Sequence, residues 1–341
     1  MMFRLKIEPI AKEILDIQFK KYPQLKEIYT PSMIATCFED ICHHLSYLNQ
    51  ALLVDSKILF ESYISWIRGV LEARNVPSEQ LQNNLVIISQ VLSKHLDDKE
   101  FKQLEEYIEL GLEVLRNDQV ATESCISQNN PQSAVAFSYL EKILAGNRRD
   151  AIKVIDDALK TNLNLEDVYL NILEPVQHEI GRLWQENKIS VAKEHYCTAI
   201  TQTIISRQYE KIFSKDRTGK KLVAACIGGE LHEMGIRMVA DFFELAGWRT
   251  YYLGANVPSE SIIDAIKEYK ANLVALSATM FIHLEPLKEL IEEIRNSGLK
   301  NVRIIVGGHP FNTDRTLCKK IGADGCAKSA RDAVILGNEL V

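Results

Sequence analysis

The chain of 341 residues has no Cys-x-x-Cys pair, no apolar run long enough to span a bilayer and no signal peptide. Its start, MMFRLKIEPI, mixes charged and apolar residues from the first few positions. The seven cysteines are scattered and odd in number, a usage that favours reduced thiols over a disulfide framework. These absences argue against a structural zinc site, a secreted protein and a membrane segment, and they predict a cytoplasmic location.

A net positive charge is also absent. The 40 Lys and Arg residues are outnumbered by 46 Asp and Glu residues, which gives a formal net charge of −6, and no basic cluster is dense. The sequence therefore predicts no direct contact with nucleic acid. The remaining composition, 46% hydrophobic and 25% charged, is typical of a globular protein, and the length is enough for two or three domains with sizeable cores.

Apolar residues recur at spacings of three and four over most of the first 213 residues. They predict helices over residues 33–52, 58–71, 81–92 and 101–115, and again over 134–144, 149–161, 166–185 and 191–213. The polar stretch ESCISQNNPQS (123–133) is predicted to be a linker between the two sets. Short connections in the second set indicate antiparallel neighbours and hence a four-helix bundle.

From about Gly219 onward, strand and helix patterns alternate. Strands are predicted over 222–227, 249–253, 273–278, 303–306 and 325–328, followed in turn by helices over 235–246, 259–270, 284–297, 313–320 and 331–340. Five such units predict a doubly wound parallel sheet of the Rossmann or flavodoxin-like kind. The predicted fold class is thus α plus α/β, with domains at 1–122, 134–216 and 217–341 and the linker at 123–133.

Two ligand motifs that are common in such sheets are missing. No Gly-x-Gly-x-x-Gly follows the first predicted strand, which argues against a nicotinamide or flavin dinucleotide site. A phosphoacceptor receiver domain needs acidic residues after the first strand and an aspartate after the third. Those places hold Gly228-Gly229 and Ser277-Ala278-Thr279, so the receiver interpretation is poor as well.

His232 is the first candidate ligand, in the loop between the first predicted strand of this sheet and its helix. Ligands of parallel sheets bind at this carboxyl edge. Glu230, two residues earlier, is placed to hold the imidazole through its other ring nitrogen, as carboxylates do for metal-ligating histidines. The alternative is a solvated loop histidine beside surface acids.

Three short motifs in this region, Glu230-x-His232-x-x-Gly235, Ser277-x-Thr279 and Gly307-Gly308, resemble those of cobalamin-binding Rossmann domains, which read Asp-x-His-x-x-Gly, Ser-x-Leu or Ser-x-Thr, and Gly-Gly. The resemblance implies that His232 is the lower axial ligand of cobalt and displaces the dimethylbenzimidazole base of the cofactor. The base then needs a slot beside the sheet, where small residues leave room. Glu230 replaces the usual aspartate, and its extra methylene still allows a hydrogen bond to the imidazole.

Trp184 and the pair Glu194-His195 are predicted at the end of one bundle helix and the start of the next, so they converge on one end of the bundle. This arrangement resembles the cap of CarH-type photoreceptors, which encloses the upper face of 5′-deoxyadenosylcobalamin. The resemblance implies that Trp184 packs on the adenosyl group and that Glu194 and His195 contact it. The alternatives are an ordinary core tryptophan and a solvated helix start.

The chain departs from that family in two respects. CarH-type repressors begin with a basic winged-helix DNA reader, which this sequence lacks. The residue after the cap tryptophan is often a histidine that binds cobalt once light has removed the adenosyl group, and here it is Gln185. This departure puts the locking step and the linked change in oligomeric state in doubt.

The first helical set contains His43-His44-x-x-Tyr47 and Tyr63-x-x-Trp66. It resembles the globin-like helical domains that precede some cobalamin-binding sensors, among them the photocobilins, which bind a bilin as well. The resemblance implies a pocket for biliverdin or another tetrapyrrole that is lined by His43, His44, Tyr47 and Trp66. Positions 43 and 47 share a helical face. The alternative is partly exposed histidines beside core aromatics.

The resemblance favours a sensor: an adenosylcobalamin-binding photoreceptor that signals by cap rearrangement to an unidentified protein partner or by a change in homo-oligomeric state. A corrinoid methyl carrier of a methyltransferase system is the alternative, because it has the same domain pair without an aromatic lid. A mutase needs a large substrate barrel, for which the chain is too short. The last predicted helix ends directly before Val341 with no catalytic domain after it, so the chain is expected not to be an enzyme.

Overall fold

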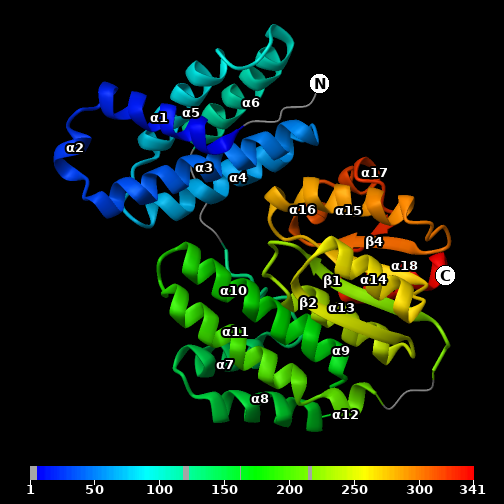
Figure 1. Ribbon diagram of the computed structural model, residues 1–341. Helices are drawn as coiled ribbons and strands as arrows, with labels where there is room; N and C mark the ends of the chain where they lie inside the picture. Colours follow the sequence, from blue (N-terminus) through cyan, green and yellow to red (C-terminus); the bar gives the residue numbers. More distant parts are fainter. Residues whose placement is uncertain (1–5, 118–122, 162, 214–216) are drawn as a thin grey trace. The chain divides into compact units, whose positions relative to one another are not determined.

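The computed structural model describes residues 6–117, 123–161, 163–213 and 217–341 (Figure 1). The chain forms two compact units, the first comprising residues 1–119 with the segments Met280–Glu285 and Thr313–Lys320, and the second Val120–Thr279, Pro286–Asn312 and Ile321–Val341. The predicted fold class, α plus α/β with a parallel sheet, is confirmed. The predicted domain limits at residues 122 and 216 fall on positions outside the described residues.

The N-terminal part of the first unit is helical. It contains α1 (Ile7–Lys21), α2 (Leu25–Ile28), α3 (Pro31–Leu53), α4 (Lys57–Glu72), α5 (Ser78–Leu92) and α6 (Asp98–Arg116). The four helices from α3 to α6 were predicted, whereas α1 and α2 were not. Asp97 starts α6 with a capping box, in which its carboxylate accepts from the backbone N–H of Glu100 at 2.8 Å.

The bundle comprises α7 (Ser133–Leu144), α8 (Arg148–Lys160), α9 (Leu165–Val168), the π-helical turn η1 (Tyr169–Leu173), α10 (Glu174–Gln185), α11 (Val191–Ser206) and α12 (Tyr209–Ile212). The single regular helix predicted over 166–185 is wrong in detail. The N–H of Glu174 donates to the carbonyl of Tyr169, five residues back, and Pro175 has no N–H to continue the α-helical pattern upstream. The helix predicted over 191–213 likewise divides, into α11 and α12.

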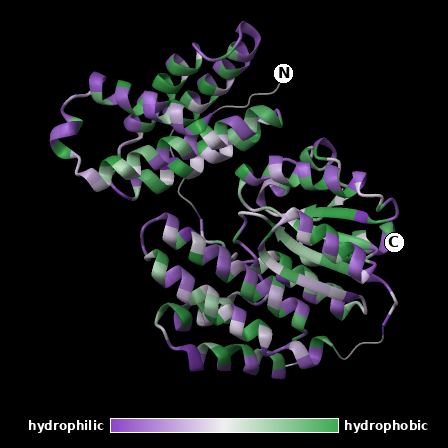
Figure 2. Ribbon diagram, in the orientation of Figure 1, coloured by the Kyte–Doolittle hydropathy of each residue, from purple (hydrophilic) through white to green (hydrophobic). Residues whose placement is uncertain are grey.

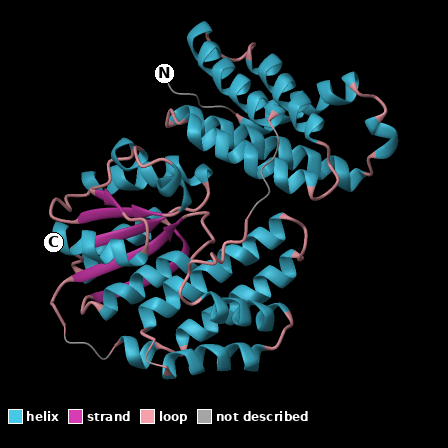
Figure 3. Cartoon of the chain, turned by 180° about the vertical axis from the view of Figure 1, so that it is seen from behind, coloured by secondary structure: helices cyan, strands magenta, loops and turns pink. Residues whose placement is uncertain are grey.

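The sheet contains β1 (Lys221–Ile227), β2 (Arg249–Val257), β3 (Leu273–Ser277), β4 (Arg303–Gly307) and β5 (Gly325–Cys326), in the order β2-β1-β3-β4-β5, and its strands pair in parallel (Figure 3). Helices α13 (Met234–Leu245) and α18 (Ala330–Leu340) pack together on one face, and α14 (Ser259–Tyr269) and α15 (Leu284–Asn296) cover the other (Figure 1). This order places the chain reversal, where ligands of such sheets bind, between β1 and β3.

Hydropathy follows these layers, with apolar strands at the centre and polar residues on the outward helix faces (Figure 2). Helix α13 packs against both the sheet and the bundle. Its Ile236, Ala240 and Phe243 join the core beneath the sheet, while Met238 and Phe242 join the core of the bundle. The bundle therefore lies against the α13 side of the sheet, and α13 connects the two layers.

Two predicted elements differ from the structure. Strand β2 continues to Val257 rather than ending at residue 253, because register shifts opposite β1 accommodate Gly254 and Asn256, both at positive φ. The helix predicted over 313–320 is wrong: α16 (His309–Thr313) and α17 (Leu317–Lys320) stand in its place. The carboxylate of Asp314 accepts from the N–H and the hydroxyl of Thr316, at 2.9 and 2.7 Å, and this local turn replaces helical bonds.

Among the described residues, no helix combines the length and the apolar character that a membrane crossing requires.

Candidate functional site

The loop after β1 presents His232 at the carboxyl edge of the sheet. Its Nδ1 donates to Oε1 of Glu230 at 2.6 Å, and its backbone N–H donates to the same oxygen at 2.9 Å. Glu230 is fully buried, whereas 58% of the His232 side chain is exposed. The contact to Nδ1 leaves Nε2, on the outer edge of the ring, to coordinate a metal, which is the arrangement that carboxylates impose on metal-bound histidines.

Glu230 is itself fixed from the neighbouring strands. The backbone N–H of Thr279, just after β3, donates to its second oxygen Oε2 at 2.6 Å. Asn256 of β2 donates its backbone N–H to the carbonyl of Glu230 at 2.9 Å, and its side-chain oxygen accepts from Gly229 at 2.7 Å. The loop therefore has bonds to both strands that flank β1, so the orientation of His232 is set by the sheet.

The hydrogen bond to Glu230 raises the pKa of His232 above its ordinary value, and the negative charges of Glu230 and Glu194 add to this effect against partial desolvation. Glu194 belongs to α11 of the bundle, so the bundle brings a carboxylate within electrostatic reach of the imidazole. A more basic imidazole is also a stronger donor to a metal ion.

A row of small residues crosses the carboxyl end of the sheet on the α13 side. Cys226 of β1 pairs in register with Ser277 of β3, and Ser277 pairs with Gly307 of β4. Because side chains alternate along strands, these positions face the same way as Ala224 and Ala275 in the core beneath α13. The row fits the requirement of a cobalamin tail for a narrow space free of bulky side chains.

The glycines of the predicted motifs lie in different structural surroundings. Gly308 has φ +111°, and a Cβ there would lie 2.1 Å from the carbonyl oxygen of Ala278, so only glycine fits the close approach of the two loops. Gly235, in the first turn of α13, is exposed, and a Cβ there would meet no atom of the described residues within 4 Å. Protein packing therefore does not explain Gly235.

The bundle residues lie where the sequence placed them. Trp184 is in the last turn of α10 and is half-buried, and Glu194 and His195 are in the first turns of α11. The Glu194 carboxylate forms a short hydrogen bond with Nδ1 of His195 and accepts from the Thr198 hydroxyl at 3.0 Å. The His195 ring is otherwise largely exposed, so the pair is ordered but open to a ligand.

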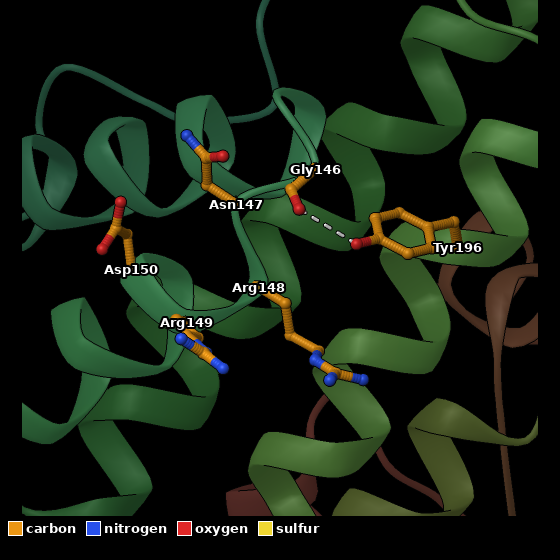
Figure 4. A pocket seen from close by; sticks show the side chains of 6 residues that line it. All are labelled: Gly146, Asn147, Arg148, Arg149, Asp150 and Tyr196. Atoms are coloured by element: carbon orange, nitrogen blue, oxygen red, sulfur yellow. Dashed lines mark hydrogen bonds between the residues drawn. The ribbon is translucent and has the colours of Figure 1, made fainter.

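A shallow hollow lies behind this helix start, lined by Gly146, Asn147, Arg148, Arg149, Asp150 and Tyr196 (Figure 4). The Tyr196 hydroxyl donates to the carbonyl of Gly146 at 3.1 Å, and the Lys193 ammonium donates to the carbonyl of Leu144 at 3.1 Å. These bonds tie the turn between α7 and α8 to the first turns of α11. They hold Glu194 and His195 in place from the outer side of the bundle.

Three of the four residues of the predicted bilin pocket, His44, Tyr47 and Trp66, pack around the ring of Tyr63. His44 and Tyr47 are buried, whereas His43 is exposed and 38% of Trp66 is exposed. Nδ1 of His44 lies 2.6 Å from the hydroxyl of Tyr63, and the rings of Tyr47 and Tyr63 stack with centroids 4.0 Å apart. His44 and Tyr47 thus belong to a packed core, whereas His43 is exposed.

Several residues at the site were missed by the sequence interpretation: Asn256, which anchors the loop, and Glu233, Tyr252 and Gln202. The Glu233 carboxylate accepts from the Tyr252 hydroxyl and from the side-chain amide of Gln202, each at 2.8 Å. Only Glu233 had a signal in the sequence, its position directly after the candidate ligand. The other three come from segments whose proximity depends on the fold.

Comparisons with known proteins match the bundle and the sheet domain to known families. A B12 binding domain model matches residues 220–335, and a second B12 binding domain model matches residues 135–207. Dimethylamine corrinoid protein 2 of Methanosarcina mazei is 27% identical over 198 residues, which cover 57% of this chain and 91% of that protein. Dimethylamine corrinoid protein 3 of the same organism is 31% identical over 121 residues, covering 35% of this chain and 71% of that protein.

A solved structure shares the fold. The monomethylamine corrinoid protein of Methanosarcina barkeri superposes with a TM-score of 0.55 at 19% identity, over 62% of this chain and all of that one. The two B12 binding domain models leave the helices α1 to α6 outside their range.

Proposed function

Because the chain belongs to the corrinoid protein family of B12-binding proteins, we propose that it is a methyl carrier that serves a methyltransferase partner. The observation that supports the proposal is the exposed His232 ring held through Nδ1 by the buried Glu230. Relatives in this family are named for dimethylamine and monomethylamine, compounds whose methyl groups are transferable. A bound corrinoid supplies a cobalt centre that takes up and releases a methyl group.

In this proposal each part of the site has a separate role. Nε2 of His232 would hold the cobalt of a bound corrinoid, and Glu230 fixes the ring and raises its basicity. Ser277, Thr279, Gly307 and Gly308 border the space for the cofactor tail, and Gly235 lets the corrin ring approach the start of α13. The bundle, with Trp184, Glu194 and His195, would cover a bound corrinoid and limit the entry of water. The chain does not catalyse the transfer alone but presents the cofactor to its partner.

Reconstitution of the full chain tests the proposal. The purified protein is loaded with hydroxocobalamin, reduced with titanium(III) citrate and treated with methyl iodide, while the absorption spectrum is recorded at each stage. A methyl carrier binds the cofactor with a His-ligated spectrum, is methylated, and then loses the methyl group when reduced free cobalamin is added as the acceptor. A chain that binds no corrinoid, or that is methylated without subsequent loss, contradicts the carrier function.

A second candidate is the sensor that binds 5′-deoxyadenosylcobalamin. It is favoured by Trp184 beside the pair Glu194 and His195, an arrangement suited to an adenosyl group, and by the extra helical unit before the bundle. In this form light removes the adenosyl group, the cap repacks, and the signal passes to a protein partner or into a change of oligomeric state. Biliverdin or another tetrapyrrole would bind in the first unit, with Trp66 and His43 as its accessible side chains.

Relative affinity separates the two candidates. A carrier binds methyl- and adenosylcobalamin about equally, whereas a sensor prefers adenosylcobalamin by about 5- to 150-fold, since a lost tryptophan contact is worth about 1–3 kcal/mol. Illumination of the adenosylcobalamin complex under green light, followed by light scattering, then detects any change in mass. A red absorption band after addition of biliverdin would support the bilin site, and its absence would remove it.

A further inference from the structure

Helix α13 presents a polar stripe to the bundle. Glu233 immediately before the helix, Arg237 and Asp241 are spaced by four residues, so they lie one above the other on one face. Each bonds to a bundle residue: Glu233 accepts from Gln202 at 2.8 Å, Arg237 donates to Ser206 at 2.7 Å, and Asp241 accepts from Tyr169 at 2.9 Å. The stripe runs beside the apolar residues Met234, Met238 and Phe242, which enter the bundle core.

Two of these contacts come from one helix of the bundle. Gln202 and Ser206 of α11 are also four residues apart, and they bond to Glu233 and Arg237 in the same chain direction. The two helices therefore run parallel at this point and are held by two successive contacts one turn apart. The name α11–α13 ladder is used below for the pairs Gln202–Glu233 and Ser206–Arg237.

The ladder lies on the same face of α11 as the cap residues. Glu194, Thr198 and Gln202 follow one another at intervals of four, and the Thr198 hydroxyl bonds to Glu194 at 3.0 Å. Glu194 is the residue whose charge reaches His232. The C-terminal part of this face therefore bonds to Glu233, the residue after His232. Its N-terminal end carries Glu194, whose charge acts on His232.

Glu233 is held on its other side by the sheet. The Tyr252 hydroxyl of β2 donates to Oε2 of Glu233 at 2.8 Å, and a Cβ at Gly254 would lie 3.3 Å from the same oxygen. Burial, with a smaller contribution from Glu233, raises the pKa of Tyr252, so its phenol remains a donor. The carboxylate thus bridges β2, the loop of His232 and α11 in one place.

We propose that Glu233 is a positioning residue, which through the α11–α13 ladder fixes the height of the cap above His232 and so limits access to the upper face of a corrinoid. The inference builds on the proposed function, because it assigns a role relative to that cofactor. A polar contact suits a lid that must open, since its groups bond to water when the helices part, whereas an apolar seam would expose apolar surface.

Three variants test the proposal. Glu233→Ala removes the bridge, Glu233→Gln keeps an oxygen for Gln202 and serves as the conservative rescue, and Arg207→Ala is the matched control. Arg207 directly follows the last residue of α11 and bonds to Asp156 within the bundle at 3.0 Å, so its loss leaves the ladder intact. The first readout needs no cofactor: hydrogen exchange of the α11 amides in the full chain. Exchange is expected to be about tenfold faster in Glu233→Ala only, as loss of one charge-assisted bond predicts.

The second readout uses the protein loaded with hydroxocobalamin. Replacement of the upper ligand by cyanide, followed by absorbance, is expected to be about tenfold faster in Glu233→Ala, and unchanged in Glu233→Gln and Arg207→Ala. Wild-type rates in Glu233→Ala for both readouts, or equal acceleration in Arg207→Ala, would overturn the proposal. If the chain binds no cobalamin, the proposed function fails, while amide exchange in α11 still decides whether Glu233 fixes the cap.

Discussion

The two compact units each hold a histidine through the same ring nitrogen, but with partners of different chemistry. Nδ1 of His44 lies 2.6 Å from the phenol of Tyr63, and Nδ1 of His232 lies 2.6 Å from the carboxylate of Glu230. His44 is 3% exposed, whereas 58% of the His232 side chain is exposed. Burial lowers the pKa of His44 to about 4, while Glu230 raises that of His232.

The difference shows that the partner and the burial of a histidine together determine its role. A neutral partner inside a core keeps the imidazole uncharged. The hydrogen bond between the two then only satisfies buried polar atoms, as at His44. A buried carboxylate beneath an exposed ring makes the imidazole a better donor toward whatever lies outside, as at His232. The sequence pattern of a histidine beside aromatic or acidic residues does not distinguish these cases, because the distinction depends on burial.

Replacement of His232 tests the ligand side of the comparison and has the largest expected effect. In His232→Ala the axial donor is lost, so the His-ligated spectrum of bound cobalamin should disappear and affinity should fall by at least about a hundredfold. Titration of hydroxocobalamin followed by absorbance measures both. The His44→Phe variant is the control and should keep the spectrum; an unchanged spectrum in His232→Ala would mean that another group binds cobalt.

Acid should destabilise the unit of His44. An unfolded histidine binds a proton near pH 6.5, whereas folded His44 binds one only near 4, so between these values the unfolded state holds more protons. Its contribution to the free energy of unfolding therefore falls by up to about 3 kcal/mol as the pH drops from 7 to 4. Urea unfolding at pH 4.5 and 7.5 measures this, and His44→Phe should flatten the profile. An identical pH profile in the variant would refute the assignment.

Glu230 is the residue that makes the two histidines differ. Glu230→Ala removes the partner of Nδ1 and the acceptor of the Thr279 N–H, so cobalamin affinity should fall by about 10- to 100-fold. Glu230→Gln keeps an acceptor for the ring without the charge and should give an intermediate loss. The same titration measures the variants, and equal affinity for all three proteins would show that Glu230 does not support the ligand.

Asp241, in the second unit, gives the smallest expected effect. Its contribution to the free energy of unfolding changes with pH in the opposite direction to that of His44. Burial raises its pKa from 3.8 to about 6, against the bond from Tyr169 and the charge of Arg237. Its stabilising contribution is full below about pH 4, where both states are protonated, and is lost as the pH rises through 6. Asp241→Asn should therefore stabilise the bundle–sheet unit by about 1–2 kcal/mol at pH 7.5 and by little at pH 4.5. Thermal unfolding at both values measures it, and a destabilised variant at pH 7.5 would contradict the assignment.

Regular helices and strands could be predicted because their apolar spacing is local. The elements that the sequence pattern did not predict correctly have several different causes. Helix α1 buries Ile10, Ala11 and Ile14 at helical spacing, so a signal was present and was overlooked. The π-turn at Tyr169–Leu173 adds a residue to a turn without disturbing the apolar pattern, and the last residues of β2 contain Gly254 and Asn256, which are poor strand formers.

At the site, the motif around His232 could be found from spacing, and its partner Glu230 with it. Asn256 and Tyr252 could not, since their approach to the loop depends on the register of β2 against β1. Gln202 and Ser206 lie 31 residues before their partners on α13, and no local pattern reports which turn of one helix meets which turn of another. The photoreceptor assignment depended on cap residues, whose roles stay predictions.

Because the ladder repeats every turn on both helices, α11 cannot slide smoothly along α13. A shift of part of a turn separates the paired polar groups, whereas a shift of one full turn, about 5.4 Å, brings Thr198 to Glu233 and Gln202 to Arg237. A displacement of one full turn along α13 is thus the sliding movement that keeps the polar groups paired. A disulfide formed in the double variant Thr198→Cys, Glu233→Cys would trap the alignment shifted by one turn. Failure of the disulfide to form under oxidation would show that only the observed alignment is reached.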